Sequence, residues 1–192
     1  MYSFFALVSR MKNIARWSLM RNSSPENVQE HSHMTAVLAH ALAVIRRDVF
    51  GVPCDPGAAA SAALFHDASE ILTGDMPTPI KYLNSQLTTA YKDAERAACD
   101  RLLSRLPEQL RGAYSPLLSG GGDDATRALV HAADKLAAYI KCLEEERAGN
   151  REFRLAAEQT LAKLKSLALP EVDYFLEHFM PPFELTIDEL NT

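Results

Sequence analysis

The sequence has 192 residues, 47% of them hydrophobic, which suffices for one domain with a sizeable core. A formal net charge of -5 without a dense Lys/Arg stripe argues against a nucleic-acid polymer as partner, and apolar runs far shorter than the roughly 20 residues that cross a bilayer argue against a membrane protein. Cys54, Cys99 and Cys142 form no CxxC pair, which argues against disulfides and zinc–thiolate sites, and without a signal-peptide pattern the expected location is cytoplasmic.

Apolar residues recur at helical spacing through almost the whole chain, and sustained strand alternation is absent, so the predicted fold class is all-α. The pattern predicts helices, in chain order, over residues 3–12, 27–48, 56–67, 85–106, 123–148, 151–167 and 171–179. The glycine run 120–122 and the aspartates after it are expected to form a surface loop that leads into an N-cap. One domain over residues 1–192 is therefore predicted, with its core at about 27–148.

The second predicted helix carries a histidine on its inner face. Four apolar residues recur at the spacing of one buried helix face: Met34, Leu38, Ala41 and Ile45. His31 lies three residues before the first of them, so its side chain is expected to point inward.

The third and fifth predicted helices direct further polar side chains inward. The inner face of the third is marked by Ala60, Ala63 and Leu64. Asp67 continues this face, and His66 lies beside it near the helix end. The inner face of the fifth helix is formed by Leu129, Ala133, Leu136 and Ile140. Asp134 lies at its edge, so three helices are expected to bring two imidazoles and two carboxylates together.

These polar residues predict a metal site. A buried carboxylate without a partner costs on the order of several kcal/mol, and the helical neighbours of Asp67 and Asp134 supply no cation. Imidazole and carboxylate together suit zinc, cobalt, manganese or iron. A lone buried histidine is more often a core residue, but the set favours one divalent ion on His31, His66, Asp67 and Asp134. His131 is the only further histidine between the pair and the last aspartate, so a second ion is not expected.

The order His31, His66-Asp67, Asp134 resembles the H…HD…D signature of the HD-domain phosphohydrolase superfamily. Longer stretches are similar to its bacterial, YfbR-like 5'-deoxyribonucleotidase family: residues 16–17 (RW), 19–22 (LMRN), 26–32 (ENVQEHS), 65–70 (FHDASE) and 73–79 (TGDMPTP). The resemblance covers nearly the whole chain. It implies an HD-domain helical bundle, one divalent metal ion such as cobalt or manganese, a homodimer, and hydrolysis of deoxyribonucleoside 5'-monophosphates.

The resemblance also implies roles for individual residues. Arg16, in an N-terminal substrate-binding segment, would orient the phosphate, and Trp17 would pack against the deoxyribose or base, although simple core packing is the alternative for a tryptophan. Glu70 is the candidate general base or water-orienting group, and Asp75 is the alternative, a choice that the sequence leaves open. The predicted substrate-binding loop consists of Asp75, Met76, Pro77 and Thr78. His131, one turn before Asp134, is a candidate partner of a metal ligand.

Two other functions are compatible with the same residues. A hydrolase of nucleoside triphosphates or of cyclic or signalling nucleotides would use the same metal core but should need more basic residues than Arg16 near it. A non-catalytic nucleotide sensor, or a protein with a structural metal, would have no use for Glu70 and Asp75. Metal-dependent phosphate release separates these classes.

Overall fold

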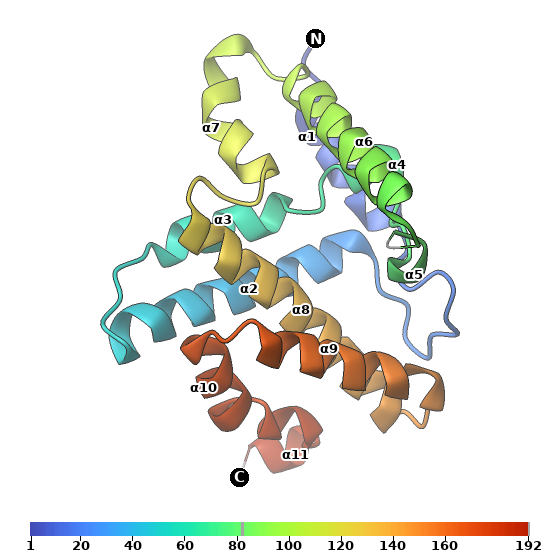
Figure 1. Cartoon of the computed structure of the whole chain (residues 1–192), viewed down its shortest axis with the longest axis vertical. Helices are drawn as coiled ribbons and strands as arrows, with labels where there is room; N and C mark the ends of the chain where they lie inside the picture. The colour runs from blue at the N-terminus through green and yellow to red at the C-terminus, as the bar shows by residue number, and fades with distance from the viewer. Residues whose placement is uncertain (82, 192) are drawn as a thin grey trace.

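A computed structural model describes residues 1–81 and 83–191, which form an all-helical domain (Figure 1). Its helices are α1 (Phe4–Val8), the 3-10 helix η1 (Ser9–Asn13), α2 (Val28–Val44), the π-helical turn η2 (Ile45–Val49), α3 (Pro56–Phe65), α4 (Glu70–Thr73), α5 (Thr78–Lys81), α6 (Ser85–Leu103), α7 (Glu108–Leu118), α8 (Asp124–Arg147), the 3-10 helix η3 (Arg151–Phe153), α9 (Arg154–Ser166), α10 (Pro170–His178), the 3-10 helix η4 (Pro181–Glu184) and α11 (Ile187–Leu190). Within these residues no β-strand occurs, which confirms the all-α prediction.

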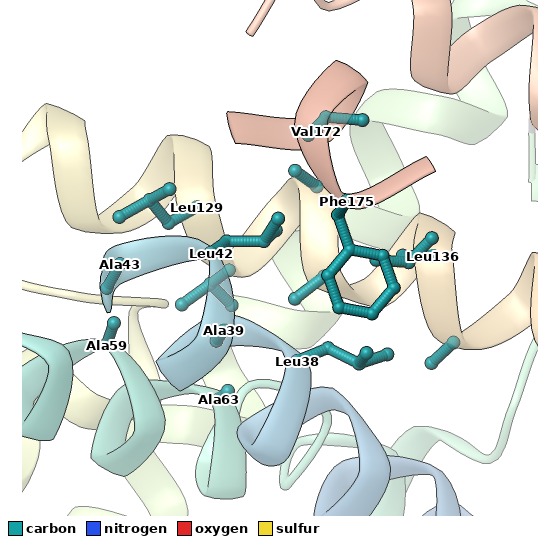
Figure 2. Close-up of a cluster of buried hydrophobic side chains, with 14 of the residues drawn as sticks. Leu38, Ala39, Leu42, Ala43, Ala59, Ala63, Leu129, Leu136, Val172 and Phe175 are labelled. Carbon is teal, nitrogen blue, oxygen red and sulfur yellow. The ribbon is translucent and has the colours of Figure 1, made fainter. Parts of the chain in front are cut away.

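Helices α2, α3 and α8 pack around the centre of the domain. Val172 and Phe175 of α10 pack into the same core, against residues of α2 and α8 (Figures 1 and 2). On the α2–α3 side the packed residues are small: Ala39 and Ala43 of α2 meet Ala59 and Ala63 of α3. Small side chains let two helix backbones approach closely. On the opposite side the core is filled by larger side chains, among them Leu42, Leu129, Leu136 and Phe175.

The predicted inner face of α2 is partly wrong. Leu38 and Ile45 are buried as expected, but Met34 is 36% exposed and Ala41 is only half-buried. Because α2 packs against α3 and α8 together, its buried arc is wide and is centred on a different row of residues. That row begins with His31, which is fully buried as predicted.

The predicted inner face of α3 also needs correction, whereas that of α8 is confirmed. The buried alanines of α3 are Ala59, Ala62 and Ala63. Ala60 is half-buried and Leu64 is 44% exposed, because the tight contact with α2 admits only small side chains and leaves the leucine outside. On α8 all four residues of the expected face are buried: Leu129, Ala133, Leu136 and Ile140.

Several predicted boundaries differ from the structure. The expected helix over 3–12 is two short pieces, α1 and η1, the helix over 56–67 ends at Phe65, and the helix over 85–106 ends at Leu103. Helix α7 was not predicted, because its sequence contains Gly112 and Pro116, both of which disfavour helix interiors. The start of α8 was predicted correctly, since the Asp123 side chain accepts a hydrogen bond from the backbone N–H of Thr126 at 2.8 Å.

The glycine run before α8 is held against the helix. Gly121 has φ +121°, and a Cβ built on it would lie 2.6 Å from the Thr126 side chain, so only glycine fits. The run therefore leads from α7 directly into the N-cap of α8. Within the described ranges no helix combines the length and apolar character needed to cross a bilayer.

Candidate metal centre and substrate pocket

His66 and Asp67 lie in a turn between two helices. Helix α3 ends at Phe65, and the chain turns through Ala68 and Ser69 before α4 begins. His66 Nδ1 lies 2.7 Å from the carbonyl oxygen of Ala63, so this nitrogen carries the hydrogen and Nε2 keeps a free lone pair. The helix end thus fixes both the position and the tautomer of the imidazole.

His31 comes from the first turn of α2. Asn27 caps this helix by accepting from the backbone N–H of Glu30, whose carboxylate in turn accepts from the N–H of Asn27. The His31 ring is fully buried, and its Nε2 lies 3.1 Å from Asp134 Oδ1, which α8 contributes. The capping box therefore holds the helix start that aims His31 at α8.

Helices α2 and α8 and the turn after α3 bring the four predicted ligands close together. Ligand atoms of His31, His66 and Asp134 all lie within 4.8 Å of one another. Asp67 is outside that set, but its Oδ2 lies 3.1 Å from His66 Nε2 and 3.6 Å from His31 Nε2.

The donor set fits a divalent metal ion. His66 Nε2 is buried and makes no hydrogen bond of normal geometry with any described residue, although it faces the cluster. Two imidazole nitrogens and carboxylate oxygens that converge in this way are the donors that borderline divalent transition metals prefer.

The groups around the cluster favour the ionised form of its two carboxylates. Burial acts to raise the pKa of Asp67, but the neighbouring His66 and His31 outweigh it and lower that pKa to about 2. For Asp134 burial also opposes ionisation, whereas the hydrogen bond with His31 and the charge of Lys135 hold its pKa well below the usual range. Both groups are therefore available as anionic ligands at neutral pH.

Each aspartate has a cation nearby, and in neither case does it come from the helical neighbours. Arg16 Nη1 lies 3.4 Å from Asp67 Oδ2, and Lys135 Nζ lies 3.0 Å from Asp134 Oδ2. Arg16 comes from a distant segment, and Lys135 is adjacent to its partner, so neither falls at the three- or four-residue spacing of helical neighbours. The argument for a metal therefore rests on the converging donor atoms and not on unpaired negative charge.

Arg16 and Trp17 are held by a residue that the sequence did not single out, Glu26. An antiparallel bridge between Ala15 and Asn27 brings the two segments together. Glu26 Oε2 accepts from Arg16 Nε at 3.1 Å and from Trp17 Nε1 at 2.9 Å. The centroid of the Trp17 ring lies 5.3 Å from that of Phe153, so the indole packs against the cluster of Cys142, Phe153 and Ala157.

Glu70 is buried near the cluster, at the start of α4. The helix does not continue from Asp67 to Glu70; instead α4 begins at Glu70 after the turn. The side chain is 7% exposed, and its Oε2 has no hydrogen-bond partner among the described residues. Burial, followed by the charges of Asp67 and Asp75, raises the pKa of Glu70 to about 9.

The predicted substrate-binding loop lies partly within reach of the cluster. Burial raises the pKa of Asp75, an effect that Arg16 opposes and Asp67 reinforces, so these three charged groups lie in one region. Met76 and Pro77 are half-buried, whereas Thr78 is exposed and begins α5.

The remaining histidines all lie at exposed positions. His33, His40 and His178 are exposed. His131 is also exposed, although partial burial of its ring, followed by the charge of Lys135, lowers its pKa while Asp134 acts in the opposite direction.

A cavity of about 580 Å³ borders His66 between α6 and α7. Its lining includes Ser69 and Cys99 but not Arg16, Trp17 or Asp75, so it is distinct from the predicted substrate residues. The centre is therefore bordered by open volume on its α6–α7 side.

Sequence comparison identifies relatives over nearly the full length. The family model described as 5'-deoxynucleotidase YfbR-like matches residues 3–183. A 5'-deoxynucleotidase of Vibrio parahaemolyticus is 48% identical over 98% of this chain and 97% of its own. The 5'-deoxynucleotidase YfbR of Escherichia coli is also 48% identical, over 98% of this chain and 95% of its own.

Solved structures share the fold. An HD-domain phosphohydrolase from Listeria innocua superposes with a TM-score of 0.83 at 25% identity, over 99% of this chain and 92% of its own. The HD phosphohydrolase DatZ of cyanophage S-2L, solved with dA and one catalytic Zn²⁺, gives a TM-score of 0.60 at 20% identity over 90% of this chain and 93% of its own, a likeness of fold.

Proposed function

This chain belongs to the YfbR-like 5'-deoxynucleotidase family, and from that premise we propose how it removes phosphate from deoxyribonucleoside 5'-monophosphates. The chain is a metal-dependent phosphohydrolase of the HD-domain fold and acts as a phosphoric monoester hydrolase. The observation that carries the proposal is the convergence of two imidazoles and two aspartates beside an arginine.

His31, His66, Asp67 and Asp134 would hold one divalent ion, with cobalt and manganese as our first candidates. When bound, such an ion supplies Lewis-acid stabilisation of the phosphate and activates the attacking water. The protein contributes the fixed tautomer of His66 and the buried position of His31, so the donors are oriented before any ligand arrives.

Arg16 would bind the phosphate. Its Nε and Nη1 are engaged by Glu26 and Asp67, which orients the guanidinium plane and makes Nη2 the donor that we assign to a phosphate oxygen. A positive group in this place offsets the charge that a transferring phosphoryl group concentrates.

Glu70 and Asp75 are the two candidates for proton transfer. Both are carboxyl groups whose pKa burial raises, and both lie near Asp67 and Arg16. We assign the proton-transfer role to Glu70, because it is the more buried group and one of its oxygens has no hydrogen bond to the described residues. Asp75, with the loop over Met76, Pro77 and Thr78, would bind the sugar.

Trp17 would form the wall against which the deoxyribose packs. Its indole is fixed by Glu26 on one edge and packs against Phe153, so it cannot move aside for an added group without losing these contacts. An apolar wall of this kind disfavours a 2'-hydroxyl, by up to roughly 100-fold where no hydrogen bond replaces water. A homodimer and a cytoplasmic location also belong to this proposal.

The test is phosphate release from deoxyribonucleoside and ribonucleoside 5'-monophosphates, triphosphates and cyclic nucleotides, with chelated protein before and after addition of cobalt, manganese, zinc or magnesium. We expect turnover of deoxy monophosphates that needs added metal. Turnover of triphosphates or cyclic nucleotides instead would move the substrate assignment. No turnover with any metal would favour a sensing role.

A further inference from the structure

We propose that Glu26 is a positioning residue of the substrate pocket, one that fixes Arg16 and Trp17 relative to each other. The inference rests on the proposed function, in which these two residues contact the phosphate and the sugar. Among the described residues, the side-chain hydrogen bonds of Glu26 go to Arg16 and Trp17 and not to a metal ligand, so its effect would pass through these two partners.

The geometry of the contact is the first argument. The guanidinium Nε of Arg16 and the indole Nε1 of Trp17 donate to the same oxygen, Glu26 Oε2. The Glu26 and Arg16 side chains are 16% and 12% exposed, so water competes little for these bonds. Because both donors share one acceptor, a rotation of either group disturbs the other.

The backbone around Glu26 is fixed as well. The backbone N–H of Arg16 donates to the carbonyl of Glu26 at 3.0 Å, and that of Val28 donates to the carbonyl of Ile14 at 3.0 Å. Directly after Arg16 the chain passes through Trp17 at φ +57°, a left-handed conformation that is unfavourable for a bulky residue. Such a conformation persists only where its surroundings hold it.

The loop that leads to Glu26 is attached to α8 by a buried carboxylate. Glu145, 1% exposed, accepts from the backbone N–H of Ser23 at 2.8 Å and of Ser24 at 3.1 Å. Lys141 bonds both to Glu145 and to the carbonyl oxygen of Ser24, and Asn150 donates to Glu145 at 2.8 Å. Glu26 is thus carried by a segment that the core of the domain holds in place.

A purely structural role for Glu26 would show itself differently. If Glu26 only stabilised the fold, its loss would lower the melting temperature and reduce the turnover of every substrate in proportion to the folded fraction. As a positioning residue it should instead change the preference between substrates and the environment of the indole. Trp17 is the only tryptophan, so its fluorescence reports on this site alone.

The experiment compares Glu26→Gln with wild type and with Glu144→Gln as the matched control. Glu144 is exposed and lines the same cavity of about 210 Å³ as Glu26. Glutamine keeps the shape of the side chain but removes its charge. The readouts are kcat/KM for a deoxyribonucleoside and the corresponding ribonucleoside 5'-monophosphate, acrylamide quenching of the fluorescence without substrate, and the melting temperature.

We expect Glu26→Gln to lower kcat/KM for the deoxynucleotide roughly 10- to 100-fold, to reduce the deoxy-to-ribo ratio, and to make the indole more quenchable at an almost unchanged melting temperature. Glu144→Gln should match wild type in all readouts. An unchanged ratio with unchanged quenching would overturn the proposal. If wild type itself hydrolyses no deoxynucleotide, the proposed function fails, and the quenching comparison still decides whether Glu26 holds Trp17.

Discussion

Arg16 Nη1 lies 3.4 Å from Asp67 Oδ2, although 51 residues separate the two in the sequence. Asp67 therefore faces the histidines of the candidate metal centre and the candidate phosphate-binding arginine at once. Because the histidines and Arg16 contact the same carboxylate, a displacement of one group would also change the contact of the other with Asp67.

Replacement Arg16→Lys should reduce activity strongly while leaving the fold intact. Lysine keeps the positive charge but lacks the planar guanidinium. That group can bond Glu26 and Asp67 and still present a further N–H donor to the phosphate. We expect kcat/KM to fall by roughly 100-fold, equivalent to about 2.7 kcal/mol. Steady-state kinetics with a melting curve test this; wild-type kinetics would show that charge alone is sufficient.

Metal should stabilise the protein. An ion that binds only the folded state adds about 2.7 kcal/mol when its concentration is 100 times its Kd. Chelated protein should therefore melt at a lower temperature than protein with cobalt or manganese. His66→Ala should abolish this difference, and the exposed His40→Ala should keep it. An equal metal effect in His66→Ala would place the ion elsewhere.

The two candidate proton-transfer groups can be separated by substitution. Glu70→Gln should lower kcat by roughly 10²- to 10⁴-fold, the range for loss of a general acid or base, with little change in KM. Asp75→Asn should mainly raise KM, because it is assigned to the sugar. Kinetics of both variants at saturating metal provide the measurement. A larger loss of kcat in Asp75→Asn than in Glu70→Gln would reverse the assignment.

Glu145 should make the protein sensitive to acid. Burial opposes its ionisation, but the bonds from Lys141, Asn150 and two backbone N–H groups outweigh this and lower its pKa below the usual range. Because the folded pKa is depressed, the stabilisation is fully present above the unfolded value of about 4.3 and is lost as the pH falls toward the folded value.

Glu145→Gln should therefore cost about 3 kcal/mol at pH 7, the lower end for a broken buried ion pair, and less as the pH falls below about 4. Urea unfolding of chelated wild type and variant at pH 7, 5 and 3.5 measures the difference. If the difference in unfolding free energy between wild type and variant were the same at all three pH values, the charge of Glu145 would not be what stabilises the loop.

Cys142 should be the least reactive of the three cysteines. Its side chain is fully buried, and burial raises its pKa to about 12, so almost no thiolate exists at pH 8. Cys54 and Cys99 are half-buried free thiols. In the native protein a thiol reagent should label these two first, and Cys142 only after unfolding. Peptide mapping by mass spectrometry identifies the order; early labelling of Cys142 would indicate local opening of α8.

The sequence predicted the features that depend on regular periodicity. The inner face of α8 and the inward direction of His31 follow from helical spacing, and both are found in the structure. Met34 and Leu64 were misplaced because a single-face pattern does not anticipate a helix packed on two sides or a contact that admits only alanine. In these cases the tertiary contacts decided which side of the helix is buried.

The partners of the site residues were beyond the reach of sequence spacing. Glu26 contacts Arg16 only because an isolated bridge aligns two segments, and Lys135 contacts Asp134 as an adjacent residue. The stretch 26–32 carried the family resemblance, which is the one signal that could have pointed to Glu26. Its role as a shared acceptor needs the three-dimensional structure.

The attachment of the Ser23–Ser24 segment to Glu145 and Asn150 has a consequence for the order in which the protein matures. A ribosome releases the chain from its N-terminus, so the arginine and tryptophan of the pocket emerge early, whereas the groups that hold their loop follow more than 120 residues later. Asp134 also emerges late. A nascent chain that ends before residue 150 would lack the support for nucleotide binding, so the pocket is completed only after most of the polypeptide has been synthesised.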